Sequence, residues 1–157
     1  MLSFFFQSHW TYIVFYSVTV LWLLEFIVFP NKHKSSTYQE KKSFFYILGL
    51  ILLTVVLNFV FGYFGWFIVS TSWLSYVAIS LSTFGFILRV TSIIYLGKFF
   101  TRHVEVQEKH ALVSKGPYWL LRHPLYLGLF LLTVNVPLFF GNIIISGLSM
   151  LWMGYIL

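Results

Sequence analysis

The sequence has no cysteine, and only 9% of its 157 residues are charged. The lack of cysteine excludes a disulfide framework, a Cys-ligated zinc site and a thiol nucleophile. A soluble domain carries about 25% charged residues, so a chain with this few charges cannot cover a water-facing surface. Because hydrophobic residues make up 59% and the mean hydropathy is +0.87, we expect the outside of the fold to face lipid.

Five apolar runs are candidates for membrane-spanning helices, which need about 20 mostly apolar residues. They cover residues 11–29, 44–61, 73–96, 125–140 and 143–157. The second run can continue through residues 62–69, and Pro137 is expected to break the fourth. The sequence therefore predicts one all-α domain, residues 1–157, built as an integral membrane bundle of about five transmembrane helices.

Lysine and arginine collect in two loops, residues 31–43 and 97–124, whereas the connections at 62–72 and 141–142 carry no charge. By the positive-inside rule both basic loops are expected on the cytosolic side, with the N-terminus outside. All five runs fit this alternation. It accounts for the net charge of +6 through membrane orientation, so we expect membrane lipids as surroundings and no nucleic-acid partner.

A polar segment, residues 97–118, lies between the third and fourth runs and is too long for a mere connection. Residues 101–106 alternate polar and apolar side chains, which suggests an extended piece. Gly116-Pro117-Tyr118 is a turn signal. The segment then leads into the fourth run, so its cytosolic end meets the start of that helix.

The start of the fourth run offers a place for an anion. Pro124 at a first helical position loses no hydrogen bond, and the free N–H groups and positive dipole end of the helix favour negative charge. Arg122 and His123 add donors there, and Gly128, one turn in, permits close approach of a ligand or another backbone. Arg122 and His123 are equally explained as basic residues that flank a span. The residues alone leave both interpretations open.

Two motifs at this place resemble a known family. Residues 110–118 (HALVSKGPY), followed by 122–128 (RHPLYLG), look like the signature of the isoprenylcysteine carboxyl methyltransferase family. Phospholipid N-methyltransferases share a looser version. Leu88-Arg89 and Leu96-Gly97 also match the pattern that precedes these motifs, so the resemblance covers about residues 88–128.

The resemblance implies a small bundle of transmembrane helices that binds S-adenosylmethionine in a cytosolic segment between helices 3 and 4. It implies as acceptor the carboxylate of a prenylated cysteine or another lipidic group, with methylation of a phospholipid amine as the alternative. The implied cofactor-binding residues are Gln107, His110, Ala111, Leu112, Val113, Gly116, Pro117, Tyr118, His123, Pro124, Leu125 and Tyr126. The candidates for catalysis are Arg89, Arg122 and His123.

The expected chemistry needs few acidic groups. A carboxylate acceptor is already ionised at neutral pH, so alignment and exclusion of water would carry the reaction. An amine acceptor would profit from a base, and Glu105 and Glu108 are the acids nearby. Similar proteins continue with a cytosolic Arg and a Glu-Glu pair, and this sequence stops at Leu157 before them. A truncated or non-catalytic relative therefore remains an alternative.

The remaining polar residues carry weaker expectations. His103, His110 and His123 lack the spacing of a metal motif, so no metal is expected. For Arg89, inside the third run, a functional role is favoured over snorkelling to the interface. For Glu25, near the end of the first run, a structural role is favoured over catalysis, and Asn58 is expected to bond a neighbouring helix.

Overall fold

The computed structural model describes residues 9–29, 38–69, 71–97 and 115–156, without the side chains of residue 26 and residues 38–44. Its helices are α1 (His9–Val28), α2 (Tyr38–Phe64), α3 (Ser72–Leu96), α4 (Pro117–Leu120), α5 (Pro124–Phe139) and α6 (Ile143–Ile156). Within these residues β structure is limited to one isolated bridge between Ile68 and Asn142. The predicted all-α class is thereby confirmed, and each apolar run forms a helix close to its expected bounds.

Two helical segments, Phe45–Phe64 and Ser72–Leu96, are long and apolar enough to cross a membrane by length and composition. Helices α5 and α6 are also apolar but shorter, at 16 and 14 residues. Large apolar side chains are exposed on the outer faces, among them Ile27 on α1 and Phe59 on α2. Exposed apolar surface of this extent is typical of a protein that contacts lipid.

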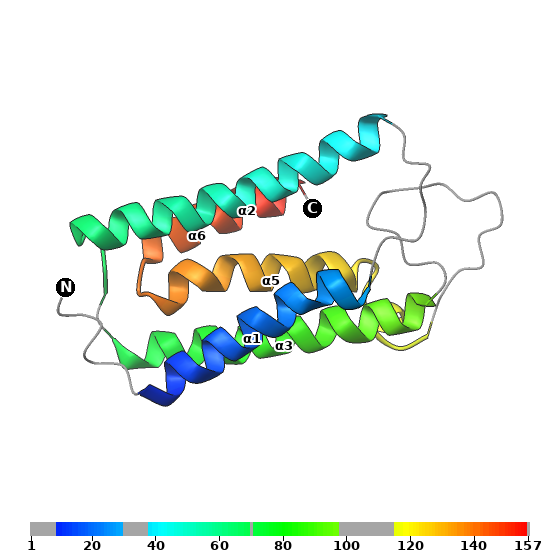
Figure 1. Ribbon diagram of the computed structural model, residues 1–157, viewed down its shortest axis with the longest axis horizontal. Coiled ribbons are helices and arrows are strands. Elements are labelled where there is room, and N and C mark those ends of the chain that lie inside the picture. The colour runs from blue at the N-terminus through cyan, green and yellow to red at the C-terminus, as the bar shows by residue number, and fades with distance from the viewer. Residues whose placement is uncertain (1–8, 30–37, 70, 98–114, 157) are drawn as a thin grey trace.

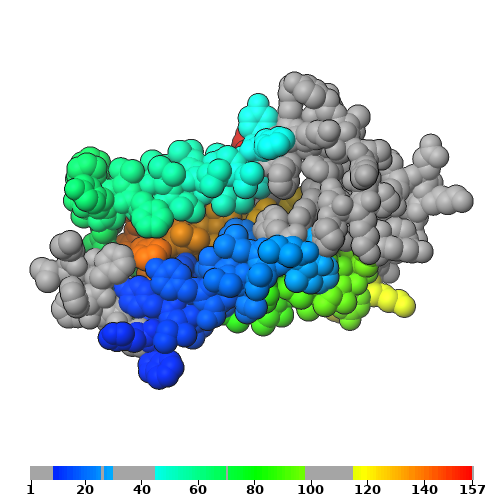
Figure 2. Space-filling view, viewed as in Figure 1, coloured from blue at the N-terminus to red at the C-terminus, as the bar shows by residue number. Residues whose placement is uncertain are grey.

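Helix α5 lies in the middle of the bundle (Figure 1). It packs most extensively on α3, and α6 and α2 contact it from the other side. Helix α1 packs mainly on α3, and part of α5 is visible between α1 and α2 (Figure 2). Trp22 of α1, Leu129 and Leu132 of α5 and Met153 of α6 form the buried core there.

Glycines bring α3 and α5 into close contact. A Cβ atom on Gly128 would lie 2.8 Å from the carbonyl oxygen of Gly85 and 3.0 Å from the Cβ of Arg89. A Cβ atom on Gly85 would in turn lie 3.1 Å from the Gly128 carbonyl oxygen. Gly128 therefore serves the close approach of a neighbouring backbone, which is one of the two roles expected from the sequence.

The ends of α1 and α3 lie at the same end of the bundle as α4 and the start of α5 (Figure 1). At the opposite end, the N–H of Val69 donates to the carbonyl of Gly141 over 2.9 Å. The basic loop expected at residues 31–43 is helical in part, because α2 begins at Tyr38 and includes Lys41 and Lys42. The start of α2 lies at the same end of the bundle as α4 (Figure 1).

The break expected at Pro137 is wrong, because α5 continues through it to Phe139. Side chains of neighbouring helices bond backbone carbonyls near the proline: Ser146 donates to Val134 over 3.2 Å and Ser75 to Phe139 over 3.3 Å. Pro137 removes one backbone donor, to the Thr133 carbonyl, and it lies only two residues before the end of α5, so little of the helix depends on that bond. The continuation of the second run to residue 69 is also not found. Helix α2 ends at Phe64, and the φ of +68° at Gly65, directly after it, is typical of a glycine helix cap.

Candidate functional site

The candidate site is built from the last two turns of α3, helix α4 and the first turn of α5, which come together at one end of the bundle. Helix α3 stops at Gly97, whose positive φ of 50° ends the helix while its N–H donates to Ile93. Helix α5 begins at Pro124, as the sequence predicts, with His123 as the N-cap residue. Proline favours this position because its fixed φ suits the helix and its missing N–H is not needed.

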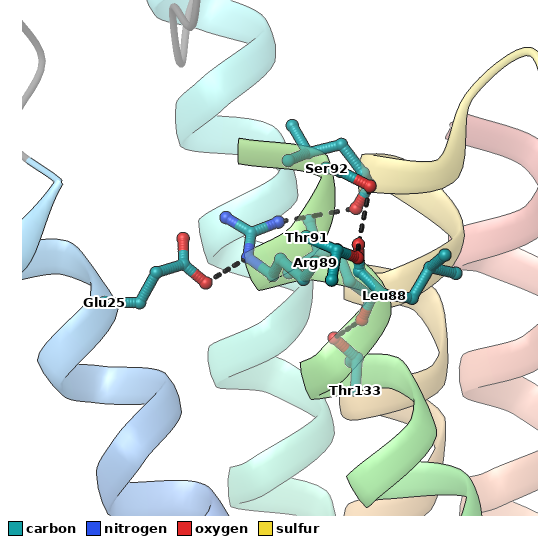
Figure 3. Close-up of polar contacts among 8 residues, drawn as sticks. Glu25, Leu88, Arg89, Thr91, Ser92 and Thr133 are labelled. Carbon is teal, nitrogen blue, oxygen red and sulfur yellow. Dashed lines mark hydrogen bonds and ion pairs between the residues drawn. The ribbon is translucent and has the colours of Figure 1, made fainter. Parts of the chain in front are cut away.

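Arg89 is the buried charge of the site. Its side chain is 6% exposed and its Nε lies 2.5 Å from Oε2 of Glu25, which is 1% exposed (Figure 3). Its Nη1 also lies 3.5 Å from the carbonyl oxygen of Leu125, in the first turn of α5. The guanidinium therefore contacts α1 and α5 from its place on α3. The alternative of snorkelling to the interface is excluded, because the charge is paired inside the bundle.

Gly116 and Tyr118 place α4 against the end of α3. Gly116 has a φ of +62°, and a Cβ atom there would lie 2.5 Å from the ring of Tyr95. The chain therefore passes closely over this ring before α4 begins at Pro117. The tyrosine two positions later, Tyr118, is half-buried, whereas Trp119 is 81% exposed. The short helix thus turns Tyr118 inward and Trp119 outward.

The Tyr118 hydroxyl is a buried polar atom without a hydrogen-bond partner among the described residues. Burial raises its pKa above the ordinary 10.0, opposed by the nearby Ser92 hydroxyl and by the charge of Arg89. The hydroxyls of Tyr118 and Ser92 do not meet the geometry of a hydrogen bond, and Ser92 donates to the Leu88 carbonyl. A neutral donor is thus left free beside the start of α5.

The first turn of α5 has donors in excess. His123 caps it without a side-chain hydrogen bond, so N–H groups of that turn remain available to another acceptor. The side chains of Arg122 and His123 are exposed beside it, and the His123 ring lies 6.1 Å from that of Tyr126. With the positive end of the helix dipole, these groups favour an anion.

These features fit the ligand that the resemblance implies. S-adenosylmethionine has a carboxylate that suits the donors at the α5 start, and a polar nucleoside that can accept from the free Tyr118 hydroxyl. Among the residues that the structure describes, no side chain bonds the Tyr118 hydroxyl and His123 makes no side-chain cap at the α5 start. Groups of three or more potential metal ligands do not occur among the residues described.

The structure brings together seven of the residues assigned to the cofactor and all three assigned to catalysis, with His123 in both sets. Those at α4 and α5 are Gly116, Pro117, Tyr118, Arg122, His123, Pro124, Leu125 and Tyr126, and Arg89 joins them from α3. Five further assignments lie outside the described residues: Gln107, His110, Ala111, Leu112 and Val113. The extended piece at 101–106 and the acids Glu105 and Glu108 lie outside them as well. Their roles stay predictions.

Two contributors to the site were not assigned from the sequence. Glu25 contacts Arg89 directly, and Tyr95 packs under Gly116. A signal for the first was present: Glu25 and Arg89 have opposite charge and lie near the ends of two spans that the alternation makes parallel. Charges inside a membrane bundle usually pair with one another, so the pair could have been predicted. Tyr95 had no comparable signal.

Comparisons with known proteins identify related sequences. Residues 76–157 match the Isoprenylcysteine carboxyl methyltransferase (ICMT) family. Over 72 residues the chain is 35% identical to Protein-S-isoprenylcysteine O-methyltransferase B and 33% identical to Protein-S-isoprenylcysteine O-methyltransferase A, both of Arabidopsis thaliana. Each match covers 45% of this chain and 36% of the relative. No solved structure shows a significant match. Because the family match covers more than half of the chain, the protein belongs to the isoprenylcysteine carboxyl methyltransferase family.

Proposed function

We propose that this protein transfers a methyl group from S-adenosylmethionine to the carboxylate of a prenylated cysteine, or to a similar lipidic acceptor, at the cytosolic membrane face. One observation supports this most strongly: a free hydroxyl donor, an open helix start and two exposed basic side chains meet at one place, inside the region that matches the family. Both plant relatives carry O-methyltransferase in their names, which favours a carboxylate over an amine acceptor.

The proposal includes a membrane arrangement. Helices α1, α2, α3, α5 and α6 are proposed to span the bilayer, with α4 at its cytosolic surface. The exposed Trp119 and Leu120 on α4 suit this interface, since amphipathic aromatic residues are enriched there. The basic segments before α2 and α4 are proposed to lie in the cytosol, in keeping with the positive-inside rule.

Within this arrangement, the first turn of α5 and the side chains of Arg122 and His123 are proposed to bind the methionine carboxylate of the cofactor. The Tyr118 hydroxyl would donate to the nucleoside, and residues 107–113 would complete that side. When bound, the cofactor supplies an electrophilic methyl group. A nearby anion that is ionised at neutral pH can accept it without a general base.

The chain's own contribution is then alignment and exclusion of water. Tyr118 and Tyr126 are half-buried and would cover the reacting groups. The apolar outer surfaces of α1 and α2 would let a prenyl chain approach from the lipid, while its carboxylate stays beside the methyl group of the bound cofactor. Holding reactants in line in a water-poor place lowers the barrier without a proton transfer.

The test is calorimetric titration of the detergent-purified protein with S-adenosylhomocysteine. We expect one site, and we expect His123→Ala to weaken binding by about tenfold, the loss typical of a removed hydrogen bond to a charged group. His9→Ala is the matched control, because His9 is exposed at the start of α1, at the other end of the bundle. Absence of binding by the wild-type protein would refute the proposed function.

A further inference from the structure

The Glu25–Arg89 ion pair joins the part of the chain that matches the family to a part that lies before the match. Arg89 lies in the matched region 76–157, and Glu25 lies in α1, before it. Both side chains are almost fully buried. A buried charge is costly unless a partner of opposite sign neutralises it, so each residue depends on the other.

The pair also fixes the direction of the Arg89 side chain. The Nε–Oε2 distance to Glu25 is 2.5 Å, which is short for a hydrogen bond between charged groups, whereas the Nη1 contact to the Leu125 carbonyl is 3.5 Å. A contact of 3.5 Å is too weak to orient a guanidinium by itself. The orientation toward α5 therefore depends on Glu25 (Figure 3).

The group that Arg89 faces belongs to the candidate cofactor site. Leu125 is the second residue of α5, next to the helix start whose N–H groups are open. The charge of Arg89 also reaches the Tyr118 hydroxyl, where it partly offsets the effect of burial on the pKa. A shift of the guanidinium would thus change both the position of the α5 start and the electrostatics at Tyr118.

We propose that Glu25 is a positioning residue of the cofactor site: its carboxylate holds the Arg89 guanidinium against the Leu125 carbonyl and so sets the α5 start opposite Tyr118. The proposal rests on the proposed function, since the site it serves is the one assigned there. It extends the site to α1, beyond the part of the chain that matches the family.

The first measurement is the dissociation constant of S-adenosylhomocysteine for Glu25→Gln, which keeps the shape and an oxygen acceptor but removes the charge. We expect an increase of about tenfold with unchanged stoichiometry, in the range known for groups that orient ligand-binding residues. Gly141→Ala is the stability control. Its Cβ would lie 2.4 Å from the Val69 carbonyl oxygen, at the opposite end of the bundle, so it should lower the melting temperature and leave the affinity unchanged.

The second measurement is a double-mutant cycle with Arg89→Gln. If Glu25 acts through Arg89, Glu25→Gln has little further effect on the affinity once Arg89 is replaced. Purely additive effects, or a Glu25→Gln protein that binds as tightly as wild type, would overturn the proposal while the proposed function stands. Absence of binding by the wild-type protein would instead refute the proposed function itself.

Discussion

Replacing Gly128 with alanine tests the contact between α3 and α5 on which the site depends. The new Cβ would lie 2.8 Å from the Gly85 carbonyl oxygen and 3.0 and 3.2 Å from the Cβ and N atoms of Arg89. These are backbone and Cβ atoms, so no side-chain rotation can relieve the overlap. Ordinary contacts begin at 3.4 Å, so the helices must separate, by up to about 0.6 Å if an ordinary contact is to be restored.

A separation of this size has a calculable consequence. A gap of about 0.5–1 Å forfeits a quarter to a half of the dispersion energy of each contact, and α3–α5 is the most extensive interface in the described bundle. Overpacking typically costs about 1–3 kcal/mol, and the helix propensity of alanine returns up to about 1 kcal/mol. Subtracting the full return leaves a net loss of about 0–2 kcal/mol, and we expect the upper part of this range because the overlapping atoms cannot rotate away. The 3.5 Å contact between Arg89 and Leu125 should lengthen as well, so the affinity for S-adenosylhomocysteine should fall.

The assay is thermal unfolding in detergent together with the binding titration. Gly147→Ala is the matched control, because Gly147 lies inside α6 and a Cβ there would meet no atom within 4 Å. That variant should be neutral or slightly stabilised, as expected for alanine in a helix. If Gly128→Ala melts at the same temperature as Gly147→Ala and binds like wild type, the close contact does not exist and the reasoning is wrong.

Two further predictions concern α4. Gly116→Ala should destabilise the protein by about 1–3 kcal/mol, measured as a lower melting temperature, because its backbone conformation is one that side chains rarely adopt; Gly49→Ala, with open space around it, is the control. Burial raises the pKa of Tyr118 in the folded protein, so the folded state holds the hydroxyl proton more tightly than the unfolded state does. The stability that this difference contributes is complete below pH 10.0 and is lost as the pH rises through the folded pKa. Melting curves should therefore show a larger loss of stability above pH 10.0 for the wild type than for Tyr118→Phe, and equal losses would contradict the burial of this hydroxyl.

The helices could be predicted from the sequence because long apolar runs leave few alternatives. Each of the five runs forms a helix, and Pro124 begins α5 as its chemistry requires. The error at Pro137 has a different origin. Pro137 lies two residues before the end of α5, so it removes a backbone bond only near that end, and the sequence does not show at which residue the helix stops.

Part of the site could also be predicted, namely the part contained in one continuous stretch. Residues 116–126 turn at α4 and lead into α5, so their proximity follows from the sequence. The Tyr95 ring under Gly116 could not be foreseen, since nothing in the sequence shows where the chain doubles back over α3. The sequence allowed Gly128 to serve the approach of either a ligand or another backbone. Only the position of Gly85 in the structure shows that it serves the backbone.

The pairing of Glu25 with Arg89 could be predicted only by comparing how deep each residue lies in its helix, because no local motif contains both. The two residues lie 64 positions apart, in helices whose ends share one end of the bundle. Considered singly, the acid near a span end predicts a structural role, and the arginine in a span predicts a functional one, but neither predicts the other as its partner. Considered together, they neutralise each other, so the net charge of +6 comes from residues other than this pair. The charges proposed to orient the chain in a membrane are therefore separate from the pair proposed to order the site.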